Sequence, residues 1–127
     1  MDLLLDTHAI IWYSEGNAKL SKASLKLIEE PDNLKFVSIV SLWEIVIKSS
    51  QNKTGFIYSV EDIHDLIKTN GFILLDITIG HLLLLQTLPH HHGDPFDRLL
   101  IAQAITEDLI IISADRHFDP YPVNVSW

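Results

Sequence analysis

The feature that most limits how this chain can fold is the alternation of short apolar runs with longer stretches typical of helices. Four apolar runs, at residues 3–5, 36–39, 72–75 and 109–112, have the length of buried parallel strands. A last short strand is expected at residues 123–125. Because strands that alternate with helices usually form a parallel sheet covered on both faces, the sequence predicts a three-layer α/β/α fold around a mainly parallel sheet.

The expected helices begin at residues whose side chains commonly cap helix N-termini. Ser21, Ser41, Ser59 and Thr78 each precede a helical segment, and Asp94 is followed by proline at the first helical position. Residues 49–56 are expected to form a loop. The predicted helices lie at residues 7–14, 21–30, 41–48, 59–70, 78–87 and 94–107.

Length and composition indicate one folded domain that spans residues 1–127. A hydrophobic content of 47% excludes a mainly disordered chain. The most apolar stretch, residues 71–88, contains Asp76, His81 and Gln86, so we expect no membrane span. The first residues lack the basic region of a signal peptide. The chain has no cysteine, which excludes disulfides and thiolate zinc sites and fits a cytoplasmic protein.

The net charge of −8 argues against tight, autonomous binding of RNA. The chain has 9 basic and 17 acidic residues, whereas a protein that holds RNA through its phosphates is usually basic over the contact face. Two circumstances would reconcile this charge with an RNA substrate. A bound cation would neutralise acids gathered in one site, or a basic partner would supply positive charge.

Four carboxylates, those of Asp6, Glu44, Asp97 and Asp115, are the strongest functional signal. Each lies just after a predicted strand or in the first turn of a predicted helix. Residues at the carboxyl ends of parallel strands converge at one edge of the sheet. Acids brought together there repel one another unless a cation lies between them, and hard oxygen ligands suit Mg²⁺ or Mn²⁺. The sequence therefore predicts metal-assisted phosphodiester chemistry.

Each acid also has a structural explanation when it is considered alone. Asp6 and Asp115 suit helix caps or turns. Asp97 occupies the third position of the helix that Asp94 caps, and it heads an apolar stripe expected to face the core or a cleft. The functional hypothesis therefore rests on the four positions taken together.

Glu44 has the strongest structural explanation of the four. It stands three residues after Ser41, which is the spacing of a capping box, and four residues before Lys48, which is the spacing of an ion pair. Taken by itself, Glu44 is better explained by structure than by catalysis.

Several polar residues near the acids are weaker candidates. Arg98 and Arg116 each follow an acid and could hold a phosphate, although an ordinary surface ion pair is the favoured explanation for either one. Ser113 could add a hydroxyl to a metal-bound water network. The histidines at residues 90–92 lack a spaced fourth ligand, which disfavours a zinc site. Trp12, Trp43 and Phe96 could stack on bases, although Trp43 and Phe96 lie beside helix starts and are better explained as core residues.

Four segments of the chain, taken in order, resemble the PIN-domain ribonucleases and, more narrowly, the VapC toxins of bacterial toxin–antitoxin pairs. The segments extend over nearly the whole chain, and the third is long enough to be specific. They are LLLDTHA at residues 3–9, VSIVSLWEI at 37–45, DPFDRLLIAQA at 94–104 and SADR at 113–116.

The resemblance implies a PIN-like fold in which Asp6, Glu44, Asp97 and Asp115 form an acidic pocket for one or two Mg²⁺ or Mn²⁺ ions. It also implies a metal-dependent endoribonuclease that hydrolyses RNA, forms a homodimer and is silenced by a small antitoxin. A basic antitoxin tail would account for the charge of −8. The alternative is a PIN-like binding or regulatory module that cleaves nothing. A phosphotransferase with Asp6 as nucleophile is disfavoured, because His8 stands where a second acid is expected.

Overall fold

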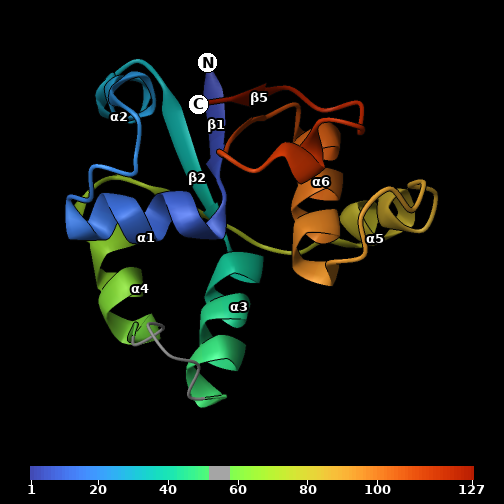
Figure 1. Ribbon diagram of the computed structural model, residues 1–127, viewed down its shortest axis with the longest axis horizontal. Coiled ribbons are helices and arrows are strands. Elements are labelled where there is room, and N and C mark those ends of the chain that lie inside the picture. The colour runs from blue at the N-terminus through green and yellow to red at the C-terminus, as the bar shows by residue number, and fades with distance from the viewer. Residues whose placement is uncertain (52–57) are drawn as a thin grey trace.

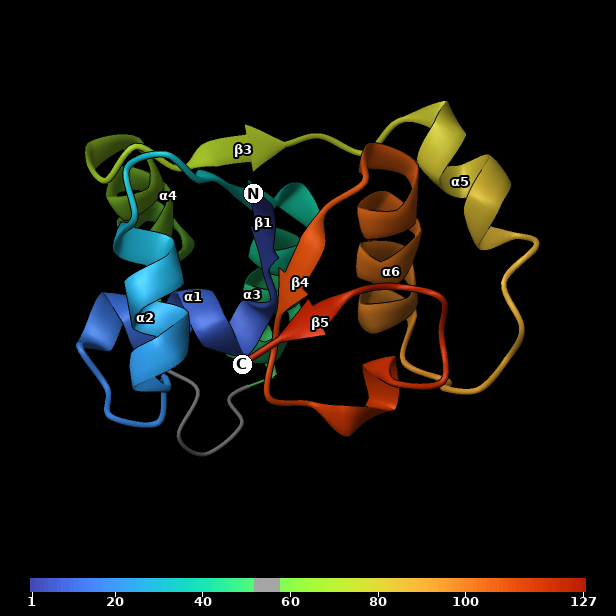
Figure 2. The same ribbon diagram turned by 90° about the horizontal axis from the view of Figure 1, so that it is seen from above.

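A parallel sheet forms the centre of the protein in a computed structural model, which describes residues 1–51 and 58–127. Among these residues the sheet has five strands, in the order β3-β2-β1-β4-β5, and every pair is parallel. Figure 2 shows β1 and β4 near the middle, with β3 and β5 at the edges. The strands are β1 (Asp2–Leu5), β2 (Leu34–Ser38), β3 (Ile73–Leu75), β4 (Ile110–Ile112) and β5 (Val125–Ser126). The predicted parallel sheet is confirmed, although β5 begins two residues later than expected.

Helices cover both faces of this sheet, which confirms the predicted three-layer α/β/α fold. Helices α1, α2 and α4 lie on one side of the sheet, and α5 and α6 lie on the other (Figure 1). The helices are α1 (Thr7–Glu15), α2 (Lys22–Glu29), α3 (Ile39–Ser50), α4 (Val60–Thr69), α5 (Ile79–Leu85), α6 (Pro95–Glu107) and the short 3-10 helix η1 (Arg116–Phe118). None of the helices in the described part of the chain is long and apolar enough to cross a membrane.

The continuous apolar run in β1 is explained by burial on both faces. Leu3 and Leu5 pack into the core beneath α1, α2 and α4, whereas Leu4 packs into the core beneath α6. All three side chains are fully buried. Because successive side chains of a strand point to opposite faces, a strand covered on both sides needs an apolar residue at every position.

Most of the predicted helix starts are confirmed by direct capping hydrogen bonds. The hydroxyls of Ser21, Ser59 and Thr78 accept hydrogen bonds from backbone N–H groups three residues further on. Asp94 caps α6 in the same way, with Pro95 at the first helical position. The cap at Asp94 fixes where Asp97 lies, one turn into the helix.

The predicted start of α3 at Ser41 is wrong. The helix begins at Ile39, and its cap is Ser38, whose hydroxyl accepts a hydrogen bond from the Val40 N–H. Glu44 therefore lies beyond the first turn and forms no capping box with Ser41. Of the loop expected at residues 49–56, residues 49 and 50 belong to α3, and residues 52–56 lie outside the described residues.

Candidate active site

The four acids singled out by sequence meet in one pocket. Asp6 follows β1 and caps α1, Asp115 follows β4 and caps η1, Glu44 projects from α3, and Asp97 lies in the first turn of α6. The pocket, called the acidic pocket below, has a volume of about 210 Å³. Its lining residues are Asp6, Thr7, His8, Glu44, Lys48, His92, Asp94, Asp97, Asp115 and His117.

Asp6 is one of two buried acids of the pocket, the other being Glu44. One of its oxygens, Oδ1, accepts a hydrogen bond of 2.8 Å from the Ala9 N–H. The pKa of Asp6 is raised to about 6, mainly by burial and in smaller part by the negative charges of Asp115 and Glu44, while hydrogen bonds from Ser113 and Ala9 act to lower it. The Asp6 carboxylate is thus held in place but costly to ionise.

Glu44 is fixed by two partners from different directions. Thr7 donates a hydrogen bond of 2.6 Å to its Oε1, and Lys48 forms an ion pair with its Oε2. The predicted pairing with Lys48, one helical turn away, is confirmed. Since Glu44 is buried and both its oxygens are engaged inside the pocket, it belongs to the floor of the site.

Asp97 is the second acid of the pocket whose pKa is raised. Burial is the main cause of a rise to about 6, and the charges of Asp94 and Glu44 add to it. A contact of 2.9 Å between Asp97 Oδ2 and His92 Nε2 acts to lower the pKa of Asp97. Asp94 is occupied as the helix cap, because its Oδ1 accepts the Asp97 N–H.

Two histidines complete one side of the pocket: His92, from the run disfavoured as a zinc site, and His117, which was not singled out from the sequence. His92 contacts Asp97, and His117 Nδ1 lies 2.7 Å from Asp115 Oδ1. The two imidazole rings stack on each other, with centroids 4.3 Å apart and planes 3° from parallel. The histidine pair therefore links the acid on α6 to the acid after β4.

Only one histidine of the run at residues 90–92 contributes to the pocket. Potential ligand atoms of His92, Asp94 and Asp97 lie within 4.8 Å of one another. The two-residue spacing from His92 to Asp94 was the available sequence signal. Its significance depended on the path of the loop before α6, which the sequence does not fix.

The three residues proposed from sequence to assist the acids occupy different places. Ser113 is buried between two acids, because it hydrogen-bonds to Asp6 and accepts the Asp115 N–H at 3.0 Å. Arg116 is exposed on η1, outside the lining of the acidic pocket.

Arg98 lies away from the acidic pocket and holds a loop in place. Its guanidinium donates to the carbonyl oxygens of Pro89 and Leu88 and to the Tyr121 hydroxyl, at 2.8, 3.3 and 3.1 Å. The side chain is buried, with its donors directed at these groups. The structure therefore gives Arg98 a buried structural role, which is neither the phosphate contact nor the surface ion pair considered from the sequence.

Replacing Arg98 by alanine is expected to destabilise the fold by about 2–4 kcal/mol, because its hydrogen bonds are lost and carbonyl oxygens are left without their donor. The matched change Arg116→Ala, on an exposed side chain, should alter stability by less than about 0.5 kcal/mol. Urea unfolding of both variants measures this difference. Equal stability of the two variants would contradict the structural role of Arg98.

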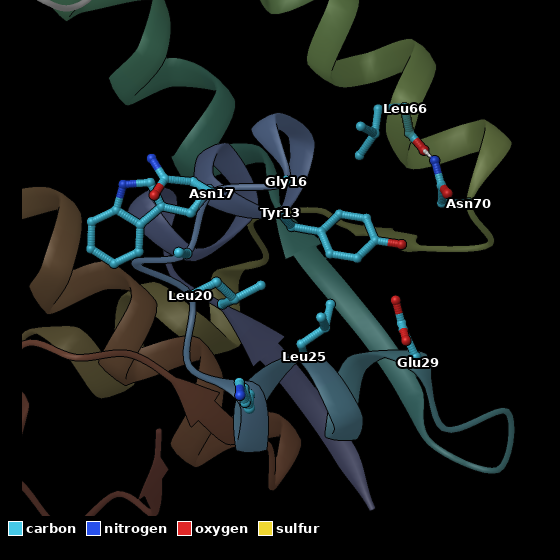
Figure 3. Close-up of a pocket in the computed structure, with 11 residues that line it drawn as sticks. Tyr13, Gly16, Asn17, Leu20, Leu25, Glu29, Leu66 and Asn70 are labelled. Carbon is cyan, nitrogen blue, oxygen red and sulfur yellow. Dashed lines mark hydrogen bonds between the residues drawn. The ribbon is translucent and has the colours of Figure 1, made fainter.

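A second, larger hollow lies between α1, α2 and α4. Its volume is about 530 Å³, and Tyr13, Leu20, Leu25 and Leu66 contribute apolar surface to it (Figure 3). This hollow, called the helical groove below, also includes Trp12, whose ring lies near the acidic pocket. Its walls come from separate helices, so sequence patterns within any one helix do not reveal it.

Comparison with known proteins identifies the family of this chain. The family model for the PIN domain matches residues 3–123, so the chain belongs to the PIN-domain family. Ribonuclease VapC22 of Mycobacterium tuberculosis (strain ATCC 25618 / H37Rv) is 30% identical over 131 residues, with 97% of each chain covered. Within the PIN-domain family, the chain therefore groups with the VapC proteins, as its sequence segments predicted.

Solved structures show the same fold at lower sequence identity. The VapBC2 structure from Rickettsia felis, bound to a promoter DNA fragment, matches with a TM-score of 0.75 and 16% identity, covering 99% of this chain and 98% of the other. The VapBC-1 structure from nontypeable Haemophilus influenzae gives 0.70 and 17%, with coverage of 99% and 97%. These likenesses confirm the PIN-like α/β/α architecture.

Proposed function

We propose that this chain is a divalent-metal-dependent endoribonuclease that hydrolyses RNA phosphodiester bonds in the cytoplasm, as the toxin of a toxin–antitoxin pair. The observation that carries the proposal is the convergence of Asp6, Glu44, Asp97 and Asp115, from four separate elements, in one small pocket. The name of the relative, Ribonuclease VapC22, supports the same activity. The presence of all four acids in one pocket favours an enzyme over a silent binding module.

The chemistry of the pocket fits a hard divalent cation. Of the described residues that line it, five carry carboxylates and one is a lysine. Burial and mutual repulsion raise the pKa of Asp6 and of Asp97 to about 6, and a cation would relieve this cost. Carboxylate oxygens are the donors that Mg²⁺ and Mn²⁺ prefer. Asp6 and Asp97 would hold one or two such ions directly, and Glu44 and Asp115 directly or through water.

The protein's own part in the reaction is to hold these oxygens in place. Ala9 and Ser113 orient Asp6, while Thr7 and Lys48 orient Glu44. Bound metal would supply a water of lowered pKa and polarise the phosphoryl oxygens. Water then adds to phosphorus, the bond to the 3′ oxygen breaks, and the products carry a 5′-phosphate and a 3′-hydroxyl.

The helical groove supports an antitoxin as a protein partner. Similar solved structures include VapBC-1 from nontypeable Haemophilus influenzae and a toxin–antitoxin complex from Klebsiella pneumoniae. The groove offers Leu20, Leu25 and Leu66 to an apolar segment, and Trp12 lies between it and the acidic pocket. A partner seated in the groove could therefore extend a basic tail towards the acids, which accounts for the net charge of −8.

The homodimer expected from the resemblance is also supported by an exposed apolar face. On α5, Ile79, Leu82 and Leu83 are 71%, 44% and 54% exposed. A second copy of the chain that packed against this face would remove it from water.

The experiment that tests this function is incubation of the purified protein with single-stranded RNA in Mg²⁺ and, separately, in excess EDTA. We expect cleavage only with Mg²⁺, and products whose new ends are a 5′-phosphate and a 3′-hydroxyl. Cleavage that persists in EDTA and leaves 2′,3′-cyclic phosphates would contradict the proposed use of metal-activated water.

A further inference from the structure

A third, smaller hollow adjoins the acidic pocket. It has a volume of about 190 Å³ and is lined by Asp6, His8, Trp12, Ala114 and Asp115. Three of these residues, Asp6, His8 and Asp115, also line the acidic pocket, so the two hollows lie side by side. We propose that this hollow, called the base site below, receives a nucleobase of the RNA strand next to the phosphate that is cut. The inference rests on the proposed nuclease function.

The base site has an aromatic wall that is fixed relative to the acids. His8 and Trp12 lie one turn apart on α1, with ring centroids 5.5 Å apart and an angle of 37° between their planes. His8 is exposed and Trp12 is half-buried. Trp127 packs edge-on against Trp12 at 5.7 Å, which braces the indole. Because Asp6 itself caps α1, the helix that carries this wall begins at a residue of the acidic pocket.

The chemistry of the base site suits a flat, uncharged group better than a phosphate. Two of its residues, Asp6 and Asp115, carry carboxylates that we assign to the cation, and the rest of the lining, His8, Trp12 and Ala114, presents aromatic and apolar surface without a cationic Lys or Arg. Bases of every kind stack on such rings, which suits RNA in single-stranded form. Lys19 could pair with the next phosphate of the RNA, because its Nζ lies 6.0 Å from the Trp12 ring centroid.

The test measures RNA binding separately from RNA cutting. A short unstructured RNA is bound to the wild-type chain in Ca²⁺, and the same RNA is then made abasic at one position at a time. We expect one abasic position to weaken binding about tenfold, the worth of one stacked base. This comparison uses only the wild-type protein, so misfolding of a variant cannot affect it.

Variants then locate the stacking residues. Trp12→Ala and His8→Ala should each weaken binding about tenfold, and Trp12→Phe should stay within about threefold of wild type. The matched control is Trp43→Ala, on an exposed tryptophan that contacts Phe96 and lies outside the base site lining. In Mg²⁺ the Trp12→Ala variant should raise KM with little change in kcat. Removing the base at the critical position should not weaken RNA binding by the Trp12→Ala variant any further, because that variant has already lost the same contact.

Each other outcome also decides the matter. The base site would be overturned if all abasic RNAs bound equally well. It would also be overturned if the loss of affinity from the abasic position added fully to the loss from Trp12→Ala. A Trp12→Ala protein that binds RNA as tightly as wild type but no longer binds a protein partner would overturn it as well. Binding that depends on Trp12 without cleavage in Mg²⁺ would keep the base site and reject the nuclease, whereas no RNA binding at all would reject both.

Discussion

Replacing Asp97 by asparagine is expected to abolish RNA cleavage while making the metal-free protein more stable. Cleavage should fall at least about 100-fold, because the variant loses a carboxylate that we assign to the cation. Stability should rise at pH 8 because burial raises the pKa of Asp97 from 3.8 to about 6, so the folded protein holds the ionised form at a cost. Asparagine removes that charge and can still accept a hydrogen bond from His92.

The pH range of this stabilisation follows from the direction of the pKa shift, and its magnitude follows from the size of the shift. The cost is absent below pH 3.8, where Asp97 is protonated in both states, and is complete above about pH 6. At pH 8 it reaches about 2–3 kcal/mol, equivalent to a melting temperature higher by roughly 5–10 °C.

Thermal unfolding in EDTA at pH 8 and at pH 4 measures the effect, which should disappear at pH 4. The matched control is Asp32→Asn, on an exposed acid remote from the pocket lining, which should change neither activity nor stability. An Asp97→Asn protein that is less stable than wild type at pH 8, or that still cuts RNA, would contradict the assignment.

Binding of Mn²⁺ is expected to release protons below about pH 6. Asp6 and Asp97 both have pKa values raised to about 6, so at pH 5 to 5.5 each must lose a proton before it can bind the cation. The apparent Kd should therefore rise between about tenfold and a hundredfold for each pH unit below 6, and should level off above pH 7.

Calorimetry in two buffers of different ionisation enthalpy counts the released protons directly. We expect between one and two protons at pH 5.5 and almost none at pH 8, with the number reduced in the Asp6→Asn variant. The like-charged acids titrate as a coupled group, so the count belongs to the pocket as a whole. A Kd that does not change between pH 5 and 8 would indicate that the ion binds elsewhere.

The sequence was sufficient to predict the sheet and the meeting of the acids because both follow from local rules. Apolar runs such as residues 3–5 identify strands buried on both faces, and parallel pairing brings the residues after β1 and β4 to one edge. Asp94 with Pro95 defines the start of α6, which fixes Asp97 in the first turn.

Local rules failed where two residues of one type compete for the same role. Ser38 and Ser41 are both suitable caps, and the choice depends on where β2 ends against its neighbours. Ser38, the last residue of that strand, caps the helix, whereas Ser41 is buried within it. Sequence spacing alone could not separate the two.

Long-range contacts explain the remaining differences. Arg98 follows an acid of the pocket, yet its side chain leaves the site for carbonyl groups of the loop before α6 and for Tyr121. His92 and His117 lie 25 positions apart and stack only because that loop and η1 meet beside the acids. Such meetings depend on loop paths, which carry little periodic signal.

The most direct test of the central claim, that the acidic pocket is a metal-dependent ribonuclease site, is RNA cleavage by folded wild-type, Asp6→Asn and Asp32→Asn proteins in Mg²⁺. We predict that wild type and Asp32→Asn cut the RNA at equal rates and that EDTA stops both. Asp6→Asn should be inactive although it is folded, because it lacks a buried carboxylate that we assign to the cation. Equal cutting by all three proteins would contradict the claim.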